Sequence, residues 1–314
     1  MKKALPQRTA IIQVIDTLSS RYLQGKIEAL RLAMVALLSD GHLLLEDIPG
    51  LGKTTLALAL SRALGLTFGR IQCTSDLMPS DITGLSIFDR ERNQFRFIEG
   101  PIFNHILLAD EINRAMPKTQ SAMLEAMEER RVTIEGTSYT LPTPFMVIAT
   151  QNPTEQIGTY PLPESQLDRF LITTGIGYPP AALEKQIIRS GGIRDKILEI
   201  EPLISREQIE HARDEVQTVY LDDRLVDYLF AIAEASRRHR FISTGISTRG
   251  AISMAAASRA LAYLDGRDYV LPEDIKQITP PVAAHRLILR TEHQSLDKRE
   301  VLLSLLNDIS VPMV

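Results

Sequence analysis

The feature that most constrains this chain is an apolar segment that runs into a glycine-rich turn and ends in Gly-Lys-Thr-Thr, over residues 43–55. Gly50 and Gly52 allow the backbone to bend until several N–H groups point inward. A helix that starts near Lys53 adds the positive end of its dipole at the same place. An ordinary strand, turn and helix start is the alternative, but it gives Lys-Thr-Thr no packing purpose. The pattern therefore predicts a strand, a loop that binds polyphosphate, and a helix.

The residues of the predicted phosphate loop have different expected tasks. The Lys53 ammonium is expected to reach the outer phosphates as a point charge, and the Thr54 hydroxyl to ligate Mg²⁺. Asp47 stands where the pattern G-x-x-x-x-G-K-S/T has glycine. Aspartate tolerates unusual backbone angles less freely than glycine, so its effect on phosphate affinity is left open. The residues predicted to form the loop's binding surface are Pro49, Gly50, Leu51, Gly52, Lys53, Thr54 and Thr55.

Bulk properties limit the class of protein. A chain of 314 residues with 44% hydrophobic residues is long enough for two packed domains. No apolar run approaches the ~18 residues of a membrane span, and no secretory apolar core follows the N-terminal Met-Lys-Lys, so we expect a cytoplasmic protein without a membrane span. Cys73 is the only cysteine, which excludes an internal disulfide and a cysteine metal cluster. The net charge of -4 offers no overall basic field for nucleic acid.

The first half of the chain alternates between apolar strands and helical stretches. Residues 56–64 have the pattern of a helix, residues 70–74 that of a short strand, and residues 106–109 and 146–149 those of further apolar strands. This alternation predicts an α/β fold with a parallel sheet between layers of helices. Ligands of such sheets bind at the carboxyl ends of the strands. One site is therefore expected to collect the polar residues that follow three strands: Glu46-Asp47, Asp110-Glu111 and Thr150-Gln151-Asn152.

Two predicted hairpins interrupt this alternation. Residues 85–88 pair with residues 95–98 across a polar turn, and residues 132–134 pair with residues 139–141 around a glycine. Between them, a helix is expected to begin with a proline in its first turn. A bare α/β core needs neither hairpin, so we interpret both as inserts.

The pattern changes at about residue 204, after which apolar residues recur with helical spacing only. Helices are expected over residues 221–235, 249–264 and 272–289. A proline pair and a glycine pair in the preceding segment indicate a hinge. We therefore predict three parts: a nucleotide-binding core over residues 1–180, a connecting helix and hinge over 181–203, and a helical domain over 204–314.

Asp110 and Glu111 follow an apolar strand directly and are interpreted as the second half of a nucleotide site. An acidic side chain at a strand end can hold Mg²⁺ through water, so Asp110 is the expected metal partner beside Thr54. Glu111 is placed to polarise the attacking water, which contributes roughly 10²–10⁴ in rate. Asn152 is expected to orient the same water, although Asn-Pro is also an ordinary turn. The alternative is that the adjacent acids cap the helix near Pro117.

Two arginines complete the predicted site. Phosphoryl transfer spreads negative charge that guanidinium groups stabilise, and an arginine finger contributes roughly 10³–10⁵ in rate. Arg249 opens a helix of the second domain, so we expect it to sense the γ-phosphate across the domain cleft. Arg169 precedes the end of the core, so we expect it to face a neighbouring subunit. The alternative for either residue is an ordinary surface position.

With these residues in place, the chain resembles the AAA+ ATPases, and among them the MoxR family, over nearly its full length. The fold that this resemblance implies is α/β: a P-loop AAA+ core with a parallel sheet in an αβα sandwich, two hairpin inserts, and a small all-helical lid domain. The resemblance rests on four phrases in order: GHLLLEDIPGLGKT over 41–54, ADEINRA over 109–115, KTQSAMLEAMEE over 118–129 and PESQLDRF over 163–170.

The resemblance also implies a role for each candidate residue. The correspondences are Gly52-Lys53-Thr54 with Walker A, Asp110-Glu111 with Walker B, Asn152 with sensor 1, Arg169 with the arginine finger and Arg249 with sensor 2. The residues implied to line the adenine pocket are Leu23, Gln24 and Gly25. The chain departs from the family pattern at Lys26, where glutamine is usual, and at Thr248, where proline is common. Neither departure removes a catalytic group.

The family further implies cofactors and partners. We expect an ATPase that binds ATP, ADP and Mg²⁺, assembles as a homo-oligomeric ring, taken to be a hexamer, and remodels or activates a protein client. The resemblance suggests clients that contain a von Willebrand factor A domain. The first hairpin, with Phe95, Arg96 and Phe97, is hypothesised to contact the client. The alternative is that its two phenylalanines pack on the core face of their own hairpin.

Two other functional classes compete with this interpretation. A nucleic-acid-linked AAA+ motor or loader uses the same core, but the acidic balance and the lack of a helix-turn-helix or zinc module argue against it. We therefore expect no nucleic-acid partner. A nucleotide-dependent switch without turnover is the third class, and the presence of Glu111 disfavours it.

Overall fold

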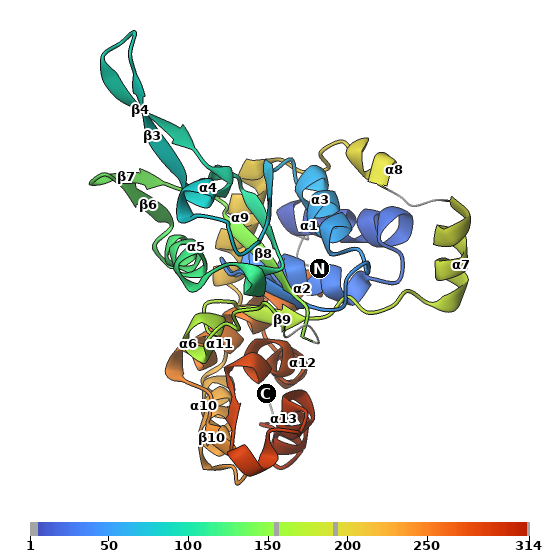
Figure 1. Ribbon diagram of the computed structural model, residues 1–314. Helices are drawn as coiled ribbons and strands as arrows, with labels where there is room; N and C mark the ends of the chain where they lie inside the picture. The colour runs from blue at the N-terminus through green and yellow to red at the C-terminus, as the bar shows by residue number, and fades with distance from the viewer. Residues whose placement is uncertain (1–5, 154–156, 191–193, 313–314) are drawn as a thin grey trace.

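A five-stranded parallel sheet forms the centre of the computed structural model, which describes residues 6–153, 157–190 and 194–312. The strand order is β2-β5-β8-β1-β9, and every neighbouring pair is parallel (Figure 1). The predicted α/β fold is confirmed. The strands are β1 (Leu43–Glu46), β2 (Phe68–Gln72), β5 (Ile106–Asp110), β8 (Met146–Gln151) and β9 (Ile172–Thr174).

Helices cover both faces of this sheet. Leu43 and Leu45 face one buried cluster, shared with α2 and α3, whereas Leu44 faces a second cluster, shared with α4 and α5. Strands buried on both faces read as continuous apolar runs, which is why the sequence shows no alternation there. The helices of this part are α1 (Pro6–Thr17), α2 (Ile27–Leu38), α3 (Lys53–Ala63), α4 (Pro79–Thr83), α5 (Pro117–Glu129) and α6 (Glu164–Leu167).

The C-terminal part is helical, as predicted, with one short exception. β10 (Ile242–Thr244) pairs antiparallel with β11 (Ile288–Leu289). The helix expected to reach residue 289 therefore ends at Ala283, because the chain then turns back to form this pair. The helices are α9 (Arg206–Gln217), α10 (Asp223–Arg238), α11 (Thr248–Leu264), α12 (Pro272–Ala283) and α13 (Lys298–Asn307).

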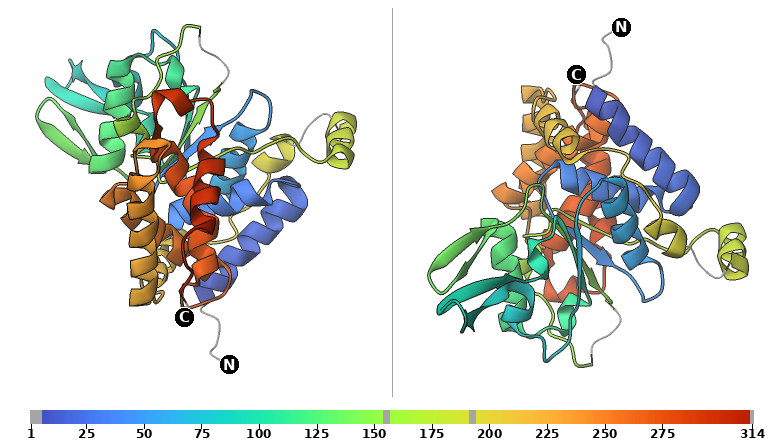
Figure 2. Two further views of the ribbon diagram at one scale, coloured as in Figure 1. Left: turned by 90° about the horizontal axis from the view of Figure 1, so that it is seen from below. Right: turned by 90° about the horizontal axis from the view of Figure 1, so that it is seen from above.

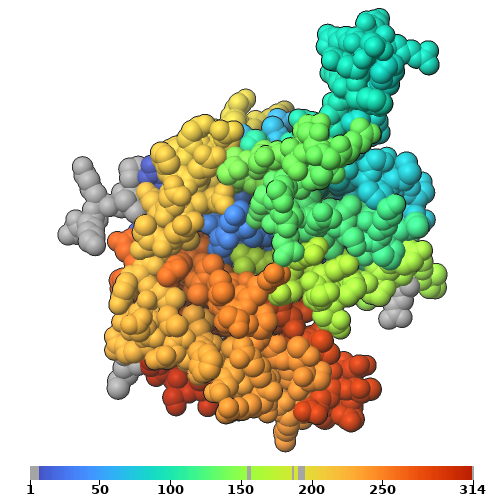
Figure 3. Space-filling model, turned by 90° about the vertical axis from the view of Figure 1, so that its left-hand side faces the viewer, coloured from blue at the N-terminus to red at the C-terminus, as the bar shows by residue number. Residues whose placement is uncertain are grey.

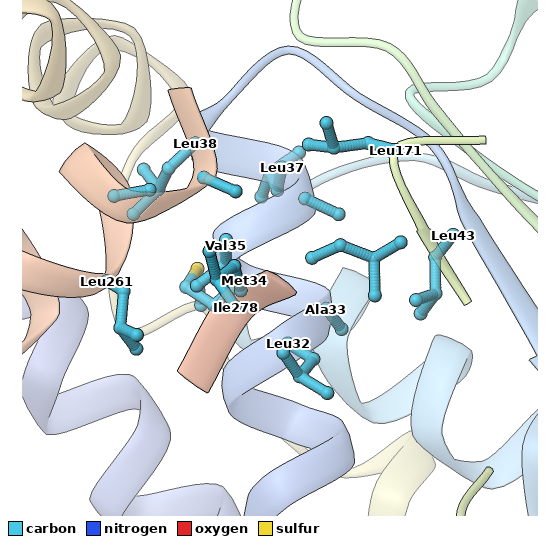
Figure 4. Close-up of a cluster of buried hydrophobic side chains, with 14 of the residues drawn as sticks. Leu32, Ala33, Met34, Val35, Leu37, Leu38, Leu43, Leu171, Leu261 and Ile278 are labelled. Atoms are coloured by element: carbon cyan, nitrogen blue, oxygen red, sulfur yellow. The ribbon is translucent and has the colours of Figure 1, made fainter. Parts of the chain in front are cut away.

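Helix α2 lies between the sheet and the C-terminal helices. Figure 4 shows its Leu32 to Leu38 side chains among Leu43 and Leu171 on one side and Leu261 and Ile278 on the other. Nine of its twelve residues are buried, so α2 is apolar nearly all round, as a central helix must be. One buried cluster thus runs from the sheet into α11 and α12. The residue boundaries of the three predicted parts stay a prediction.

Both predicted hairpins are confirmed. β3 (Gly84–Asp89) pairs with β4 (Gln94–Glu99), and β6 (Arg131–Ile134) pairs with β7 (Thr137–Thr140). The β3–β4 hairpin projects far from the body, as Figures 1 and 3 show. The Phe97 ring at its base stacks on Tyr139 of the second hairpin, with 4.1 Å between ring centroids. The two inserts therefore touch each other at their bases.

Two short helices link the two halves of the chain. α7 (Ala181–Ser190) lies at the periphery of the molecule in both views of Figure 2. α8 (Arg194–Leu198) packs on α3 through Ile197, which is fully buried. The predicted glycine hinge at residues 191–192 lies outside the described residues. Among the residues that are described, no helix has the length and apolar character needed to cross a membrane.

Candidate functional site

The predicted phosphate loop, residues 47–52, joins the end of β1 to the start of α3. Gly50 (φ 87°) and Gly52 (φ 91°) both adopt the left-handed backbone conformation that favours glycine. Gly52 is also crowded, because a Cβ atom there would lie 2.4 Å from Lys26 Nζ. Side chains are therefore disfavoured at both bends, and the loop can present its N–H groups to an anion as expected.

Asp47, the departure from the glycine pattern, has a task of its own. It is not among the described non-glycine residues with a positive φ, so the backbone does not require glycine there. Its Oδ2 atom accepts hydrogen bonds from the backbone N–H groups of Ile176 (2.6 Å) and Gly177 (2.8 Å). These two residues follow β9, so the carboxylate fastens the phosphate loop to the segment that leads into α7.

Lys53 is the first residue of α3 and is buried, with 8% of its surface exposed. Its Nζ atom donates a hydrogen bond to the backbone oxygen of Asp47 at 2.5 Å. Burial lowers the pKa of Lys53, and the carboxylates of Asp47, Asp110 and Glu111 oppose this shift. Thr54, the next residue, lines a cavity of about 280 Å³. Lys53 thus lies within electrostatic range of Asp47 and of the carboxylates at the end of β5.

Asp110 ends β5, beside Thr150 of β8. Its Oδ1 atom accepts a hydrogen bond from the Thr150 hydroxyl (2.7 Å), and its Oδ2 atom pairs with Arg70 of β2 (2.8 Å). Register places these residues together, because β2, β5 and β8 are neighbours in the sheet. Asp110 is therefore held from both adjacent strands. Thr150 was expected at this edge only as a polar residue after a strand, and Arg70, in the middle of β2, carried no such signal.

Glu111 has an unusual backbone conformation, with φ 58° and ψ 52°. A non-glycine residue in this region costs free energy, so the surroundings must hold it there. Its N–H donates to Thr150 Oγ1 at 2.8 Å. Its Oε2 atom accepts from Gln72 Nε2 (3.0 Å) and pairs with Arg114 (3.3 Å). The carboxylate is thus positioned by two side chains that sequence reasoning missed.

Asn152 lies at the same edge of the sheet, directly after β8. Gln151 pairs in register with Glu46 of β1, so the end of β8 meets the start of the phosphate loop. Asn152 is half-buried there. The structure therefore brings it to the edge that also carries Asp110 and Glu111. Its role in orienting water stays a prediction.

A cavity of about 660 Å³ opens beside the phosphate loop. Leu23 and Gln24 line it from one side, and Tyr178 lines it from the segment before α7. Gly25 adopts φ 74°, and a Cβ atom there would lie 2.7 Å from Pro180 Cδ, so the turn packs closely against that segment. This volume suits a purine nucleoside next to a polyphosphate site. A pocket is therefore present beside Leu23 and Gln24, and its use for adenine stays a prediction.

The two predicted arginines lie together. Arg169 Nε is 3.1 Å from Glu128 Oε2, and an Arg249 nitrogen is 3.0 Å from Glu128 Oε1. Both guanidinium groups thus bind the same carboxylate, at the end of α5. Arg249 also lies 3.8 Å from Asp168, which pairs in turn with the buried Arg286. Because Arg286 ties the lid to the segment after α6, the cluster joins the two parts of the chain.

The expectation that Arg249 senses the γ-phosphate stays a prediction. We expected it to approach the γ-phosphate across the domain cleft of its own chain. The contacts that the structure gives it, Glu128 and Asp168, belong to α5 and the segment after α6 rather than to the phosphate loop. Its side chain is 57% exposed, so it points outward beside Arg169. The docking of the lid determines this position, and helical periodicity carries no information about it.

Comparison with protein families finds two matches. Residues 42–172 match the ATPase family associated with various cellular activities (AAA), and residues 234–303 match the AAA lid domain. The first match spans four strands of the sheet and both hairpins and ends at the first residue of β9. The second spans β10, β11, α11 and α12, with the end of α10 and the start of α13.

Individual relatives match over most of the chain. An uncharacterized protein of Bacillus subtilis, YeaC, is 43% identical over 94% of this chain and 92% of its own length. Chaperone MoxR1 of Mycobacterium tuberculosis is 40% identical, covering 86% of this chain and 73% of its own. Protein MoxR of Paracoccus denitrificans is 31% identical, covering 90% of each. A crystal structure of a protein from Cytophaga hutchinsonii, assigned as an ATPase, superposes with a TM-score of 0.91 at 35% identity and covers 99% of this chain and 98% of its own.

Proposed function

This ATPase belongs to the MoxR family of AAA+ proteins, and we propose that it hydrolyses ATP with Mg²⁺ in a cytoplasmic homo-oligomeric ring that remodels or activates a protein client. The single observation that carries the ring is the position of the two arginines. Arg169 and Arg249 share Glu128, and among the contacts of the described residues neither guanidinium reaches the phosphate loop of its own chain. Phosphoryl transfer needs such charges, so a neighbouring copy supplies them.

The hydrolytic step follows from the contacts of Glu111. With ATP in the phosphate loop, its carboxylate accepts a proton from the water that attacks the γ-phosphorus. Gln72 and Arg114 hold the carboxylate on one side, and the Thr150 hydroxyl fixes the backbone. Asn152 would orient the same water from the end of β8. Lys53 would neutralise charge on the outer phosphates, and ADP and phosphate then leave.

The residues present suit Mg²⁺. The Thr54 hydroxyl and the Asp110 carboxylate are hard oxygen donors, which this ion prefers. Among the described residues, no group of three or more His, Cys, Asp or Glu side chains forms a complete metal cage. Mg²⁺ keeps several waters and binds through one or two protein groups plus phosphate oxygens, so a sparse donor set fits it. When bound, the ion neutralises charge on the transferring phosphoryl group.

The proposed ring follows from the positions of the two arginines and the phosphate loop, which lie on different surfaces of one chain. A contact between two different surfaces is heterologous, and it generates a closed ring when the rotation closes. The hexamer that the family implies is part of the proposal. We expect ATPase activity per chain to rise with protein concentration as the ring assembles. Constant specific activity over a hundredfold dilution, with Arg169→Ala unimpaired, contradicts it.

The proposed client surface is the tip of the β3–β4 hairpin. Phe95 is 66% exposed and Phe88 50% exposed, and their rings touch with centroids 5.3 Å apart. Phe97, which we grouped with Phe95, instead packs between Tyr139 and Phe103. The alternative, in which the phenylalanine is packed rather than free to contact a client, thus applies to Phe97. Phe95 instead exposes an apolar ring to solvent at the tip. The relative Chaperone MoxR1 of Mycobacterium tuberculosis is named as a chaperone, which supports a protein client.

A client trap tests this assignment. A Glu111→Gln variant loaded with ATP is expected to retain client from a cytoplasmic extract, including any protein with a von Willebrand factor A domain. Adding Phe95→Ala should reduce the captured protein severalfold. Phe230→Ala, which removes an aromatic ring that is 58% exposed on α10, is the matched control. Equal capture by both double variants contradicts a role for the hairpin tip, and stimulation of ATPase activity by DNA would instead favour a nucleic-acid motor.

A further inference from the structure

Lys26 rests on the phosphate loop, although no nucleotide-binding role has been assigned to it. It follows the turn of Leu23 to Gly25, and its Nζ atom donates a hydrogen bond to the backbone oxygen of Leu51 at 2.5 Å. The same Nζ atom lies over Gly52, where a Cβ atom would approach it to 2.4 Å. A side chain at position 52 would therefore require this ammonium to move. Its position is built into the loop rather than being that of a free surface lysine.

The loop thus carries two ammonium groups, one at each end. Lys53 donates to the oxygen of Asp47, and Lys26 donates to the oxygen of Leu51. An ammonium has three N–H donors, so a single bond to a carbonyl leaves donors for an anion. The two groups differ in direction. Lys26 lines the 660 Å³ cavity of the base pocket, whereas Lys53 is turned toward Asp110 and Glu111.

Asp47 balances the charge of this pair. It attracts both ammonium groups, which opposes the effect of burial on the pKa of Lys26 and of Lys53. Its carboxylate cannot move freely toward either lysine, because it accepts the N–H groups of Ile176 and Gly177. Lys26, which departs from the family pattern, and Asp47, which departs from the general glycine pattern of the loop, therefore lie at one loop with opposite charges. Because the charges of Lys26 and Asp47 cancel, an anion beside Lys53 meets no net negative charge from this pair.

We propose that Lys26 is a second phosphate-binding residue, which contacts the α- and β-phosphates on the base side of the loop while Lys53 contacts the outer phosphates. This inference rests on the proposed nucleotide site. A nucleotide whose base fills the cavity must pass its first phosphates by the Lys26 ammonium before the chain of phosphates reaches Lys53. The bond to Leu51 then exchanges with, or is shared by, a phosphate oxygen.

Equilibrium binding of ADP, ATP and adenosine tests this role. Lys26→Gln restores the residue usual in the family and removes the charge while keeping most of the side-chain length. We expect it to weaken ADP and ATP about tenfold each, the size of one charge-assisted hydrogen bond, because both nucleotides have the same inner phosphates. Adenosine, which has no phosphate, should bind unchanged. Lys26→Arg should recover most of the ADP affinity, since it restores the charge.

The controls separate this inference from the nucleotide site itself. Lys118→Gln makes the same charge change at an exposed position on α5 and should leave ADP affinity unchanged. Lys53→Ala should abolish ADP binding, and its failure to do so would count against the site as a whole. If Lys53→Ala loses ADP but Lys26→Gln binds it normally, only the role of Lys26 is refuted. Equal losses for adenosine and ADP, with a lower melting temperature of the ligand-free variant, would also refute it, because Lys26 would then only shape the loop.

Discussion

The phosphate-loop region and the arginine region use charge in opposite ways. Around the loop, cations and anions alternate, and Asp110 and Glu111 each have several partners that fix their geometry. In the arginine region, one partly exposed carboxylate, Glu128, holds two guanidinium groups. The first arrangement is organised before any ligand arrives, whereas the second is easily exchanged for another anion. Under the proposed function, one chain carries a preorganised nucleotide site and depends on a neighbouring chain for the arginine.

The largest expected effect tests this division directly. Arg169→Ala should reduce kcat about 10³–10⁵-fold without loss of ATP affinity, since the guanidinium stabilises charge only in the transition state. A mixture of Arg169→Ala with Lys53→Ala should regain activity, because one copy supplies the loop and the other the arginine. Steady-state ATPase assays of the single variants and of their mixture measure both. If mixing restores nothing in a ring of normal size, Arg169 acts within its own chain.

The second-largest effect is expected in the phosphate-loop region, at Glu111. Glu111→Gln should lower kcat about 10²–10⁴-fold, because glutamine cannot accept the proton from water. ATP should still bind with an affinity close to that of the unchanged protein, since Lys53 and the loop are intact. Single-turnover hydrolysis and equilibrium ATP binding separate the two quantities. A matched loss of binding would show that Glu111 shapes the pocket rather than the chemical step.

His42 connects the two regions and makes the connection sensitive to pH. It precedes β1, its Nδ1 atom accepts the N–H of Val147, and its Nε2 atom bonds to the oxygen of Met127, next to Glu128. Burial and the nearby Arg130 lower its pKa to about 3, so the folded state binds the proton poorly. Stability is therefore full above the ordinary pKa of about 6.5 and is lost as pH falls toward 3.

The expected loss of unfolding free energy between pH 7 and pH 5 is about 2 kcal/mol from this group alone. Urea unfolding at the two pH values measures it. His42→Gln should be less stable at both pH values. The difference between its two unfolding free energies should be smaller than that of the unchanged protein by about 2 kcal/mol. The buried His285, whose pKa is also lowered, is present in both proteins and cancels from the comparison. Equal pH dependence of the two proteins would rule out His42 as the source.

A smaller effect is expected from the partner of Glu111 on β2. Gln72→Ala removes the 3.0 Å hydrogen bond to Oε2 and leaves the ion pair with Arg114, so kcat should fall about tenfold. KM for ATP should stay the same, because Gln72 positions the base and does not touch the nucleotide. Gln72→Glu should be more harmful than Gln72→Ala, since it places a like charge beside Glu111. A change in KM without a change in kcat would contradict a positioning role.

The smallest effect is expected at Glu128. Its carboxylate is 39% exposed, and exposed ion pairs stabilise a fold by about 1 kcal/mol or less. Glu128→Gln should therefore lower the free energy of unfolding by less than about 1 kcal/mol, as thermal or urea unfolding would show. A loss of several kcal/mol would mean that the arginine region is as rigidly organised as the phosphate loop, which would end the contrast between the two.

The sequence predicted the parts of this protein whose signals are local. The phosphate loop, the acidic pair after β5 and both hairpins carry their own turn residues and apolar runs, and all are confirmed in position. β9 was missed because three buried residues are too few for a strand pattern. Helices α1 and α2 were not predicted either, and α2 is buried on nearly all sides, so it lacks the amphipathic period that marks a helix.

The remaining errors concern contacts between distant segments. Nothing near Asp47 in the sequence indicates that Ile176 and Gly177 bind its carboxylate, because that contact depends on how β9 joins β1. The contacts of Arg249 with Glu128 and Asp168 were not predicted for the same reason. Its place beside Glu128 is set by Arg286, which attaches the lid to the segment after α6 through Asp168. Periodicity predicts which face of a helix is buried, but it does not predict the surface on which the helix docks.

The stack of Phe97 on Tyr139 has a mechanical consequence. Between Glu111, the proposed base, and Tyr139, the chain passes without a long loop through α5 and Glu128 into the second hairpin. The stacked rings then join that hairpin to the projecting β3–β4 tip. A helix is stiff along its axis, so α5 can move as a rigid body against the sheet on which it packs. A small tilt at the nucleotide end would be magnified at the tip, and force applied to the tip would return to Glu111 along the same path.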